Sequence, residues 1–180
     1  WPTDQPRSEY NAIIYLQPAT NPNRRALGYD MGTEQTRRNA MNLARDTGKP
    51  IASGRVELVQ EQDIPDADKQ LGFLIYMPVY RNDAVVSTEA ERRQALVGFV
   101  YSPFRIEDFL EPVTNTAKTQ DVSFAVYDGT EVNSANLISK AVNEVSTAPI
   151  FEVNKPKDIA GRTWTLAFAT NPSFESHSSR

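Results

Sequence analysis

Residues 33–47 have the hydrophobic spacing of a helix that lies on a sheet. The positions that share one face are Ala40, Leu43, Ala44 and Thr47. Thr33 can cap the start of this helix, because its hydroxyl can accept a hydrogen bond from a free amide of the first turn. Gly48 suits the left-handed position after the last turn, and Pro50 cannot continue a helix. The pattern therefore predicts a helix over residues 33–47.

Several other segments have the alternation, or the β-branched and aromatic content, of strands. They are residues 10–16, 51–60, 72–80, 95–101, 122–127, 150–153 and 163–169. Asn-Pro-Asn at residues 21–23 predicts a turn, and residues 61–70 predict a polar loop. Residues 89–93 predict a short helical turn. Residues 106–117 predict a longer helix, which Pro112 should kink or restart.

The order of these elements indicates an α+β fold. Neighbouring strands are joined by connections of hairpin length, which is typical of antiparallel sheets flanked by helices. Residues 130–149 carry too weak a pattern to assign. The series of sheet, helix and sheet, with a break at Ser102-Pro103, predicts two units, residues 1–103 and residues 104–180.

Composition and charge exclude some classes of function. The chain of 180 residues is 39% hydrophobic and has a formal net charge of −4. This balance argues against a nucleic-acid surface, because phosphate binding needs a concentrated basic field. The pair Arg37-Arg38 stands near carboxylates and, like Arg45 and Asp46, is interpreted as part of a solvated surface.

Candidate catalytic chemistry is missing from the sequence. The chain has no cysteine and one histidine, His177 near its end, which argues against thiolate or imidazole metal sites and against histidine-based triads. It contains neither a phosphate-binding glycine loop nor a G-x-S-x-G elbow. The sequence therefore predicts no catalytic residue, no metal site and no cofactor.

The chain also shows no membrane or export segment. No apolar run approaches the roughly 18 residues that a membrane span needs, and the start has no signal-peptide pattern. Because the chain begins at Trp1, we expect a fragment excised from a longer protein. The missing membrane segments are then no evidence that the parent protein is soluble.

Asp30 is the most prominent candidate for binding, since it lies among apolar neighbours between two predicted elements. A buried aspartate can accept strong hydrogen bonds from a ligand amine or ring N–H. Aspartates in such positions more often cap a helix or a turn, and this alternative stays open. Tyr29, Met31 and Met77 could line an adaptable apolar pocket, or they could belong to the core.

Several blocks of residues occur in a fixed order along the chain. They are Gly28-Tyr29-Asp30-Met31, Arg37-Arg38, Ala44-Arg45-Asp46-Thr47-Gly48, Gln60, Pro78-Val79-Tyr80-Arg81, Glu91-Arg92-Arg93, Leu96-Val97-Gly98, Phe104-Arg105 and Leu110. Together they resemble the CHASE domain, the extracytoplasmic ligand-binding region of plant cytokinin receptor histidine kinases and of many bacterial membrane receptors. The resemblance is strong over residues 10–112 and weak over the remainder.

The resemblance implies a fold of two PAS-like units, each an antiparallel sheet flanked by helices. A long N-terminal stalk helix would precede them in the parent protein and is absent from this fragment. Residues 1–103 would form the membrane-distal, ligand-binding unit. Residues 104–180 would form the membrane-proximal unit.

The resemblance also assigns pocket positions in the distal unit. Asp30 matches the aspartate that hydrogen-bonds an adenine ring and its exocyclic N–H, and Ile51 matches a main-chain contact to the purine. Thr47, Gln60, Met77 and Gly98 fall at further pocket positions of the family. Tyr29 and Met31 are expected pocket residues only because they are neighbours of Asp30. Gln60 and Met77 depart from the threonine and the aromatic residue of the family. The expected ligand is therefore an adenine-like or other small N–H-bearing compound rather than cytokinin itself.

Taken as a whole, the resemblance implies a sensor domain in the periplasm or outside the cell. The parent would span the membrane and carry a cytoplasmic histidine kinase or diguanylate cyclase. A small molecule would be its partner, nucleic acid would not, and a homodimer could form through the missing stalk helix. The alternative is an interaction or dimerisation ectodomain that binds no small molecule.

Overall fold

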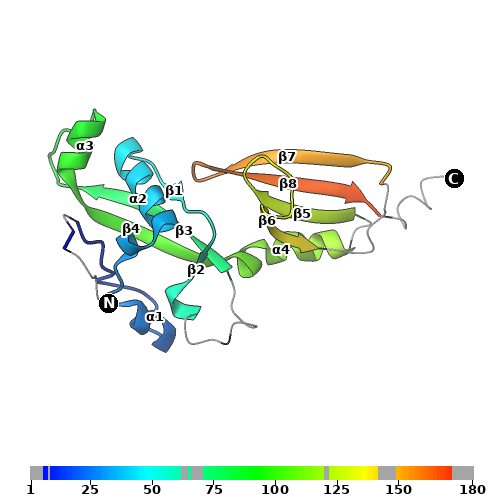
Figure 1. Ribbon diagram of the computed structural model, residues 1–180, viewed down its shortest axis with the longest axis horizontal. Coiled ribbons are helices and arrows are strands. Elements are labelled where there is room, and N and C mark those ends of the chain that lie inside the picture. Colours follow the sequence, from blue (N-terminus) through cyan, green and yellow to red (C-terminus); the bar gives the residue numbers. More distant parts are fainter. Residues whose placement is uncertain are drawn as a thin grey trace. The chain divides into compact units, whose positions relative to one another are not determined.

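The computed structural model divides the chain into two compact units, Trp1–Arg105 and Ile106–Arg180. It describes residues 6–7, 9–61, 65, 71–119, 122–141 and 149–171. Each unit combines a four-stranded antiparallel sheet with helices (Figure 1). The prediction of an α+β fold with two PAS-like units is confirmed. The predicted boundary followed residue 103, and the two compact units meet after Arg105.

In the first unit the long strand β3, Leu71–Tyr80, is the centre of the sheet. From Gly72 to Tyr80 it pairs with β4, Leu96–Arg105. The short helix α3, Glu89–Ala95, lies in the connection between the two strands. Two short strands, β1 (Ile51–Ala52) and β2 (Val56–Glu57), pair with successive parts of β3. All three pairings are antiparallel. Together they make the sheet on which the remaining elements of this unit pack.

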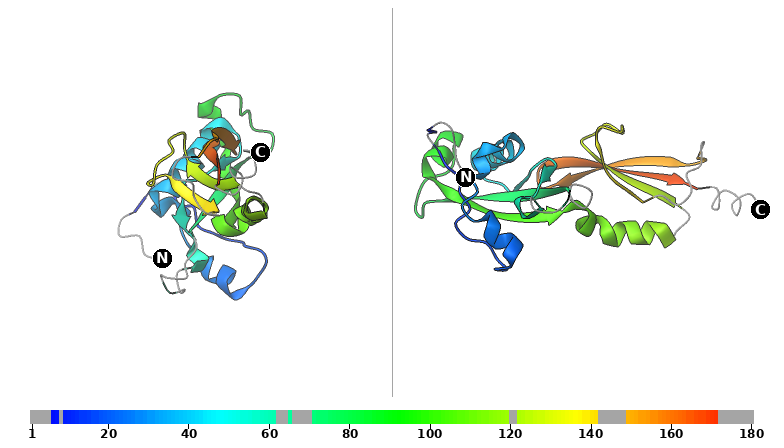
Figure 2. Two further views of the ribbon diagram at one scale, coloured as in Figure 1. Left: turned by 90° about the vertical axis from the view of Figure 1, so that its right-hand side faces the viewer. Right: turned by 60° about the horizontal axis from the view of Figure 1, so that its bottom comes forward.

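Helix α2, Gln35–Thr47, covers one face of this sheet (Figures 1 and 2). Its buried residues Ala40, Met41 and Ala44 belong to one core with Leu74 and Tyr76 of β3. Side chains alternate between the two faces of a strand, so Phe73 and Ile75 of β3 point to the face away from the helix. Phe73 stacks on Phe104 of β4 with the ring centroids 5.1 Å apart.

The prediction for the end of α2 is confirmed, and the prediction for its start is wrong. Gly48 takes the left-handed conformation with φ of 72° after the last turn, as predicted. The predicted cap Thr33 is wrong, because Glu34 holds that place and its carboxylate accepts from the amides of Thr36 and Arg37. Thr33 instead ends a 3₁₀ turn, Met31–Thr33, and its hydroxyl donates to the carbonyl of Asp30.

Residues 10–16 do not form the predicted strand. They make one isolated bridge, between Ala12 and Asp30, in which the amide of Ile13 donates to Tyr29 and the amide of Met31 donates to Asn11. The carbonyl of Ile13 accepts one further bond, from the amide of Gly28. Ile13 is buried, whereas Ile14 is 91% exposed. These residues have high β-propensity. They nevertheless remain an extended segment, because only residues 28–31 pair with them and this stretch is too short to build a ladder.

Other local predictions also need correction. Residues 21–23 begin helix α1, Asn21–Ala26, rather than a turn, with proline at its first turn. The predicted strand 51–60 is broken into β1, β2 and a 3₁₀ turn, Val59–Glu61. The break begins at Ser53. In a regular ladder the backbone carbonyl of Ser53 would accept from the amide of Leu74, but here the hydroxyl of Ser53 accepts this bond instead. Most of the predicted loop 61–70 lies outside the described residues.

The second unit begins with helix α4, Ile106–Thr119, and its strands are β5 (Val122–Asp128), β6 (Leu137–Ala141), β7 (Glu152–Ile159) and β8 (Arg162–Thr170). Their order in the sheet is β6-β5-β8-β7. Phe109 of α4 packs edge-on against Trp164 of β8 at 6.0 Å. Helix α4 continues through Pro112 instead of restarting there. Strand β6 falls in the stretch that the sequence pattern left unassigned.

Candidate functional site: an arginine-lined groove in the first unit

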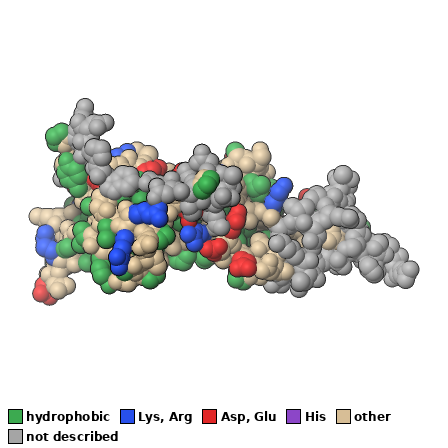
Figure 3. All heavy atoms as spheres, turned by 90° about the horizontal axis from the view of Figure 1, so that it is seen from below, with side chains coloured by type: hydrophobic (Ala, Val, Ile, Leu, Met, Phe, Trp, Pro, Cys, Tyr) green, Lys and Arg blue, Asp and Glu red, His purple; other side chains and the backbone are tan. Residues whose placement is uncertain are grey.

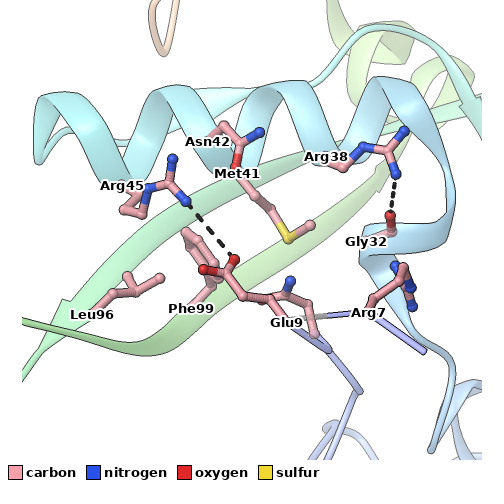
Figure 4. Close-up of a pocket in the computed structure, with 10 residues that line it drawn as sticks. Arg7, Glu9, Gly32, Arg38, Met41, Asn42, Arg45, Leu96 and Phe99 are labelled. Atoms are coloured by element: carbon pink, nitrogen blue, oxygen red, sulfur yellow. Dashed lines mark hydrogen bonds and ion pairs between the residues drawn. The ribbon is translucent and has the colours of Figure 1, made fainter. Parts of the chain in front are cut away.

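A groove of about 500 Å³ opens between helix α2 and strand β4 (Figure 4). Its lining residues come from the N-terminal segment, the 3₁₀ turn, α2 and β4. They are Arg7, Glu9, Asn11, Gly32, Arg38, Met41, Asn42, Arg45, Leu96 and Phe99. This volume lies in the range of small-molecule pockets, about 300–1,000 Å³.

Helix α2 supplies one wall because four of its residues share a face. Arg38, Met41, Asn42 and Arg45 follow the spacing i, i+3, i+4 and i+7, which aligns side chains along a helix. Met41 points into the groove between the two arginines (Figure 4). The caps at Glu34 and Gly48 hold this helix at both ends, so the wall has a defined length and direction.

The three groove arginines differ in how their charges are balanced. Arg7 forms an ion pair with Asp30. Arg45, whose side chain is 14% exposed, donates from Nε to Oδ1 of Asp46 at 2.7 Å. Arg38 donates to the carbonyl of Gly32 at 3.0 Å and to the amide oxygen of Gln35. Among the described residues Arg38 therefore has uncharged partners only.

The rest of the groove is an apolar surface with one carboxylate above it. Met41 is buried, and Leu96 and Phe99 are half-buried. Glu9 comes from the N-terminal segment, and its side chain is 65% exposed. Its Oε2 lies 3.9 Å from Nη1 of Arg45. The groove thus offers cationic groups at its wall and an apolar floor.

The family of the chain follows from comparison with known sequences. The model of the CHASE domain family matches residues 1–138, which is more than half of the chain. The chain belongs to the CHASE domain family. It is therefore a sensor domain of a signalling receptor, and a CHASE domain is sensory rather than catalytic.

A curated relative agrees with this assignment. The CHASE domain is 24% identical over 186 aligned residues to a protein of Dictyostelium discoideum, "Hybrid signal transduction histidine kinase A". The alignment covers 93% of this chain and 9% of that protein. The chain thus spans less than a tenth of the length of this relative. Within the described residues of the CHASE domain, no helix combines the length and apolar character of a membrane span.

Asp30 is buried but does not line the groove. Its Oδ1 accepts from the amides of Asn11 at 3.0 Å and Gly32 at 2.9 Å, and its Oδ2 pairs with Arg7. It also caps the 3₁₀ turn Met31–Thr33. Its carboxylate therefore ties the N-terminal segment to this 3₁₀ turn of the CHASE domain. The expected contact with a ligand stays a prediction, and Arg7 stands between Asp30 and the groove.

Met31 and Gln60 line a second, much smaller cavity of about 10 Å³. Arg37 and Tyr101 also line this cavity. Nε of Arg37 and the hydroxyl of Tyr101 are buried and have no hydrogen-bond partner in the described part of the chain. Burial raises the pKa of Tyr101 to about 12, so this hydroxyl keeps its proton at neutral pH. A cavity of this size holds about one water molecule, which could accept from both groups.

The other expected pocket residues lie in different places. Tyr29 accepts from Nη1 of Arg37 at 3.3 Å, Ile51 is buried in the ladder opposite Tyr76, and Thr47 donates to the carbonyl of Leu43. Met77 and Gly98 project from the face of the sheet opposite to Tyr76 and Phe99, because side chains alternate along β3 and β4. The structure therefore does not gather the expected pocket residues around one cavity.

The groove was not found from the sequence. The interpretation of Arg37, Arg45 and Asp46 as solvated also needs correction, because Arg37 is 4% exposed and the side chains of Arg45 and Asp46 are 14% and 17% exposed. The signal that could have found the groove is the spacing of Arg38, Met41 and Arg45. A solvated face and a groove wall share that spacing, so only the fold of the N-terminal segment distinguishes them.

Asp46 joins α2 to α3 at the end of the groove. It accepts from Arg93 at 2.8 and 2.7 Å and from Arg45 at 2.7 Å. Around it, Arg92 donates to the backbone carbonyl of Asp46, and Tyr80 donates to the carbonyl of Arg45. The hydrogen bonds from Arg93 and Arg45 hold the pKa of Asp46 well below its usual range, against the opposing effect of burial.

Replacing Asp46 with asparagine should lower the free energy of unfolding at pH 7 by about 1 kcal/mol, since Arg93 is half exposed and screened. A carboxylate with a lowered pKa stabilises the fold above its unfolded pKa, near 4, and this contribution is lost as the pH falls below it. The difference between the two proteins should therefore shrink between pH 5 and pH 2. Urea unfolding over this range measures it.

The matched control for Asp46 is Glu89→Gln. It breaks the exposed pair of Glu89 with Arg93 on α3 and should change stability by less than about 0.5 kcal/mol. A difference between wild type and Asp46→Asn that stays constant from pH 5 to pH 2 would show that the ion pairs of Asp46 do not stabilise the fold.

Proposed function

We propose that this CHASE domain is the extracytoplasmic sensor of a membrane-spanning receptor and that it binds a small molecule in the groove of its first unit. The signal would pass to a cytoplasmic histidine kinase or diguanylate cyclase. Membership of a sensory family and similarity to a hybrid histidine kinase support this proposal. The observation that carries it is the groove of about 500 Å³ between α2 and β4.

The elements around the groove suggest how binding would be transmitted. A ligand can shift a conformational equilibrium only if it binds the two states with different affinity. Helix α2 carries the wall of the groove, and its end is held by α3 and β3 through Asp46 and Tyr80. Strand β4 carries the floor and continues directly into α4 at Ile106. A small movement of α2 against β4 would thus reach the start of the second unit through the chain itself.

An interaction or dimerisation ectodomain is the second candidate function. It is favoured by the sheet face opposite α2, where Met77, Val79 and Val100 are 45%, 40% and 64% exposed. Exposed apolar side chains gathered on one face are typical of a surface that meets another protein. The face of the molecule in Figure 3 shows a different pattern, in which basic, acidic and hydrophobic groups are mixed.

A thermal-shift screen distinguishes the two functions. We expect a compound from a panel of purines, amino acids and carboxylates to raise the unfolding midpoint, because a ligand that binds only the folded state stabilises it. At a ligand concentration of 100 times Kd the gain is about 2.7 kcal/mol. Analytical ultracentrifugation over a range of protein concentrations provides the second readout. No shift with any compound, together with a concentration-dependent dimer, would favour the interaction ectodomain.

A further inference from the structure

The wall of the groove on helix α2 carries two arginines, Arg38 and Arg45, with Met41 between them. Arg38 and Arg45 are seven residues apart, which places their backbones about 10 Å apart along the helix axis. Met41 lies between them and points into the groove (Figure 4). Each end of this wall therefore carries a guanidinium group, and its middle is apolar. A guanidinium matches the planar, two-oxygen geometry of a carboxylate better than that of any neutral group.

Arg38 lacks an acidic partner in the part of the chain that the structure describes. Its bonds go to the carbonyl of Gly32 and to Gln35. Arg7 lies at the same end of the groove, close to Gly32, but its charge is balanced by Asp30. The positive charge at this end is therefore uncompensated and belongs chiefly to Arg38.

At the other end of the groove, the carboxylate of Glu9 lies near Arg45. Its carboxylate lies 3.9 Å from Nη1 of Arg45, beyond the 2.7–2.9 Å or so of a charge-assisted hydrogen bond. The side chain of Glu9 is 65% exposed and belongs to the extended N-terminal segment. This carboxylate therefore stands near Arg45 without a close bond, in a place that another carboxylate can take.

We propose that the groove binds a small dicarboxylate with an apolar middle, which rests on the proposed function as a small-molecule sensor. One carboxylate displaces Glu9 and pairs with Arg45. The other pairs with Arg38, and the chain between them lies on Met41 and Phe99. This ligand class differs from the N–H-bearing compound expected at Asp30, since the groups that face the groove are mainly hydrogen-bond donors.

The test compares linear dicarboxylates from succinate to suberate with hexanoate and with adipamide. We expect at least one dicarboxylate to bind in isothermal titration calorimetry, hexanoate to bind about tenfold or more weakly, and adipamide to show no binding. Arg38→Gln and Arg45→Gln should each weaken dicarboxylate binding by about tenfold or more, as expected for hydrogen bonds to a charged group. Arg81→Gln, which removes the same charge from an exposed position outside the groove, should leave the affinity unchanged.

Glu9→Gln gives a readout of opposite sign that folding defects cannot imitate. Removing the competing carboxylate should raise the affinity of the dicarboxylate by about twofold to fivefold, because an exposed ion pair contributes at most about 1 kcal/mol. Equal binding of adipamide, no binding of any dicarboxylate, or unchanged affinity in Arg45→Gln and Glu9→Gln would overturn the proposal. If the broader panel then yields a neutral or cationic ligand, the sensor function stands and only the ligand class is wrong.

Discussion

Replacing Asp30 with alanine should lower the free energy of unfolding by about 3 kcal/mol, the largest effect that we expect of a single substitution in this CHASE domain. Asp30 is 4% exposed, and its carboxylate accepts from the amides of Asn11 and Gly32 while pairing with Arg7. Alanine would leave two amides and one guanidinium without their acceptor. Removing one partner of a buried charged pair costs about 3–5 kcal/mol, and the partial exposure of Arg7 places our expectation at the low end.

Urea unfolding followed by circular dichroism measures this loss. Hydrogen exchange of the β3 amides assigns it to the first unit, because a chain of two units need not unfold in one step. Asp30→Asn is the matched control, since its side-chain oxygen can still accept from the two amides while the charge is lost. We expect asparagine to recover about half of the loss.

The same variant tests the alternative role of Asp30. If Asp30 contacts a ligand and has no structural role, Asp30→Ala should keep the free energy of unfolding within about 0.5 kcal/mol of wild type. The same variant should then no longer bind a compound found in the thermal-shift screen. That outcome would contradict the structural role and support the expected contact with an N–H-bearing ligand.

Replacing Gly72 with alanine should lower the free energy of unfolding by about 2–3 kcal/mol, the typical penalty of forcing an extra methyl group into a filled space. A Cβ at this position would lie 2.6 Å from Cγ of Leu58 and 2.6 Å from the backbone carbonyl of Phe104. The carbonyl belongs to the neighbouring strand β4 and cannot retreat without disturbing the ladder between β3 and β4. Urea unfolding and the exchange of the β3 and β4 amides measure the effect.

Gly98→Ala is the matched control in the same sheet. A Cβ at Gly98 would meet nothing within 4 Å, so we expect stability unchanged or raised by up to about 1 kcal/mol through the smaller entropy of the unfolded chain. Equal losses in Gly72→Ala and Gly98→Ala would show that backbone freedom, and not close approach of strands, governs both positions. Loss of ligand binding in Gly98→Ala alone would support its expected place in a ligand pocket.

Much of the fold could be predicted from local pattern. The helix that became Gln35–Thr47, its glycine end and the two apolar strands that became β3 and β4 all follow from hydrophobic period and capping chemistry, which act over a few residues. The cap at Glu34 was missed because Thr33 and Glu34 are neighbours that can both accept from free amides. The 3₁₀ turn that engages Thr33 decides between them.

The site was predicted less well because its parts come from distant segments. Arg38 and Arg45 are on α2, Glu9 is in the N-terminal segment, and Phe99 is on β4. Residues 10–16 have the pattern of a strand, so the sequence did not predict that they form an extended segment bonded to residues 28–31. Arg37 also looked solvated, although it donates to the carbonyl of Glu57 from a buried position.

The sequence by itself determined the α+β class, the helix on the sheet and, through the order of its blocks, the CHASE family. These depend on periodicity and on residues close together along the chain. Only the tertiary structure decided that Asp30 is held by Arg7 and two amides, that Met77 and Gly98 face away from α2, and that the arginines of α2 wall a groove. Burial and charge balance depend on which distant segments meet, and no local pattern contains that information.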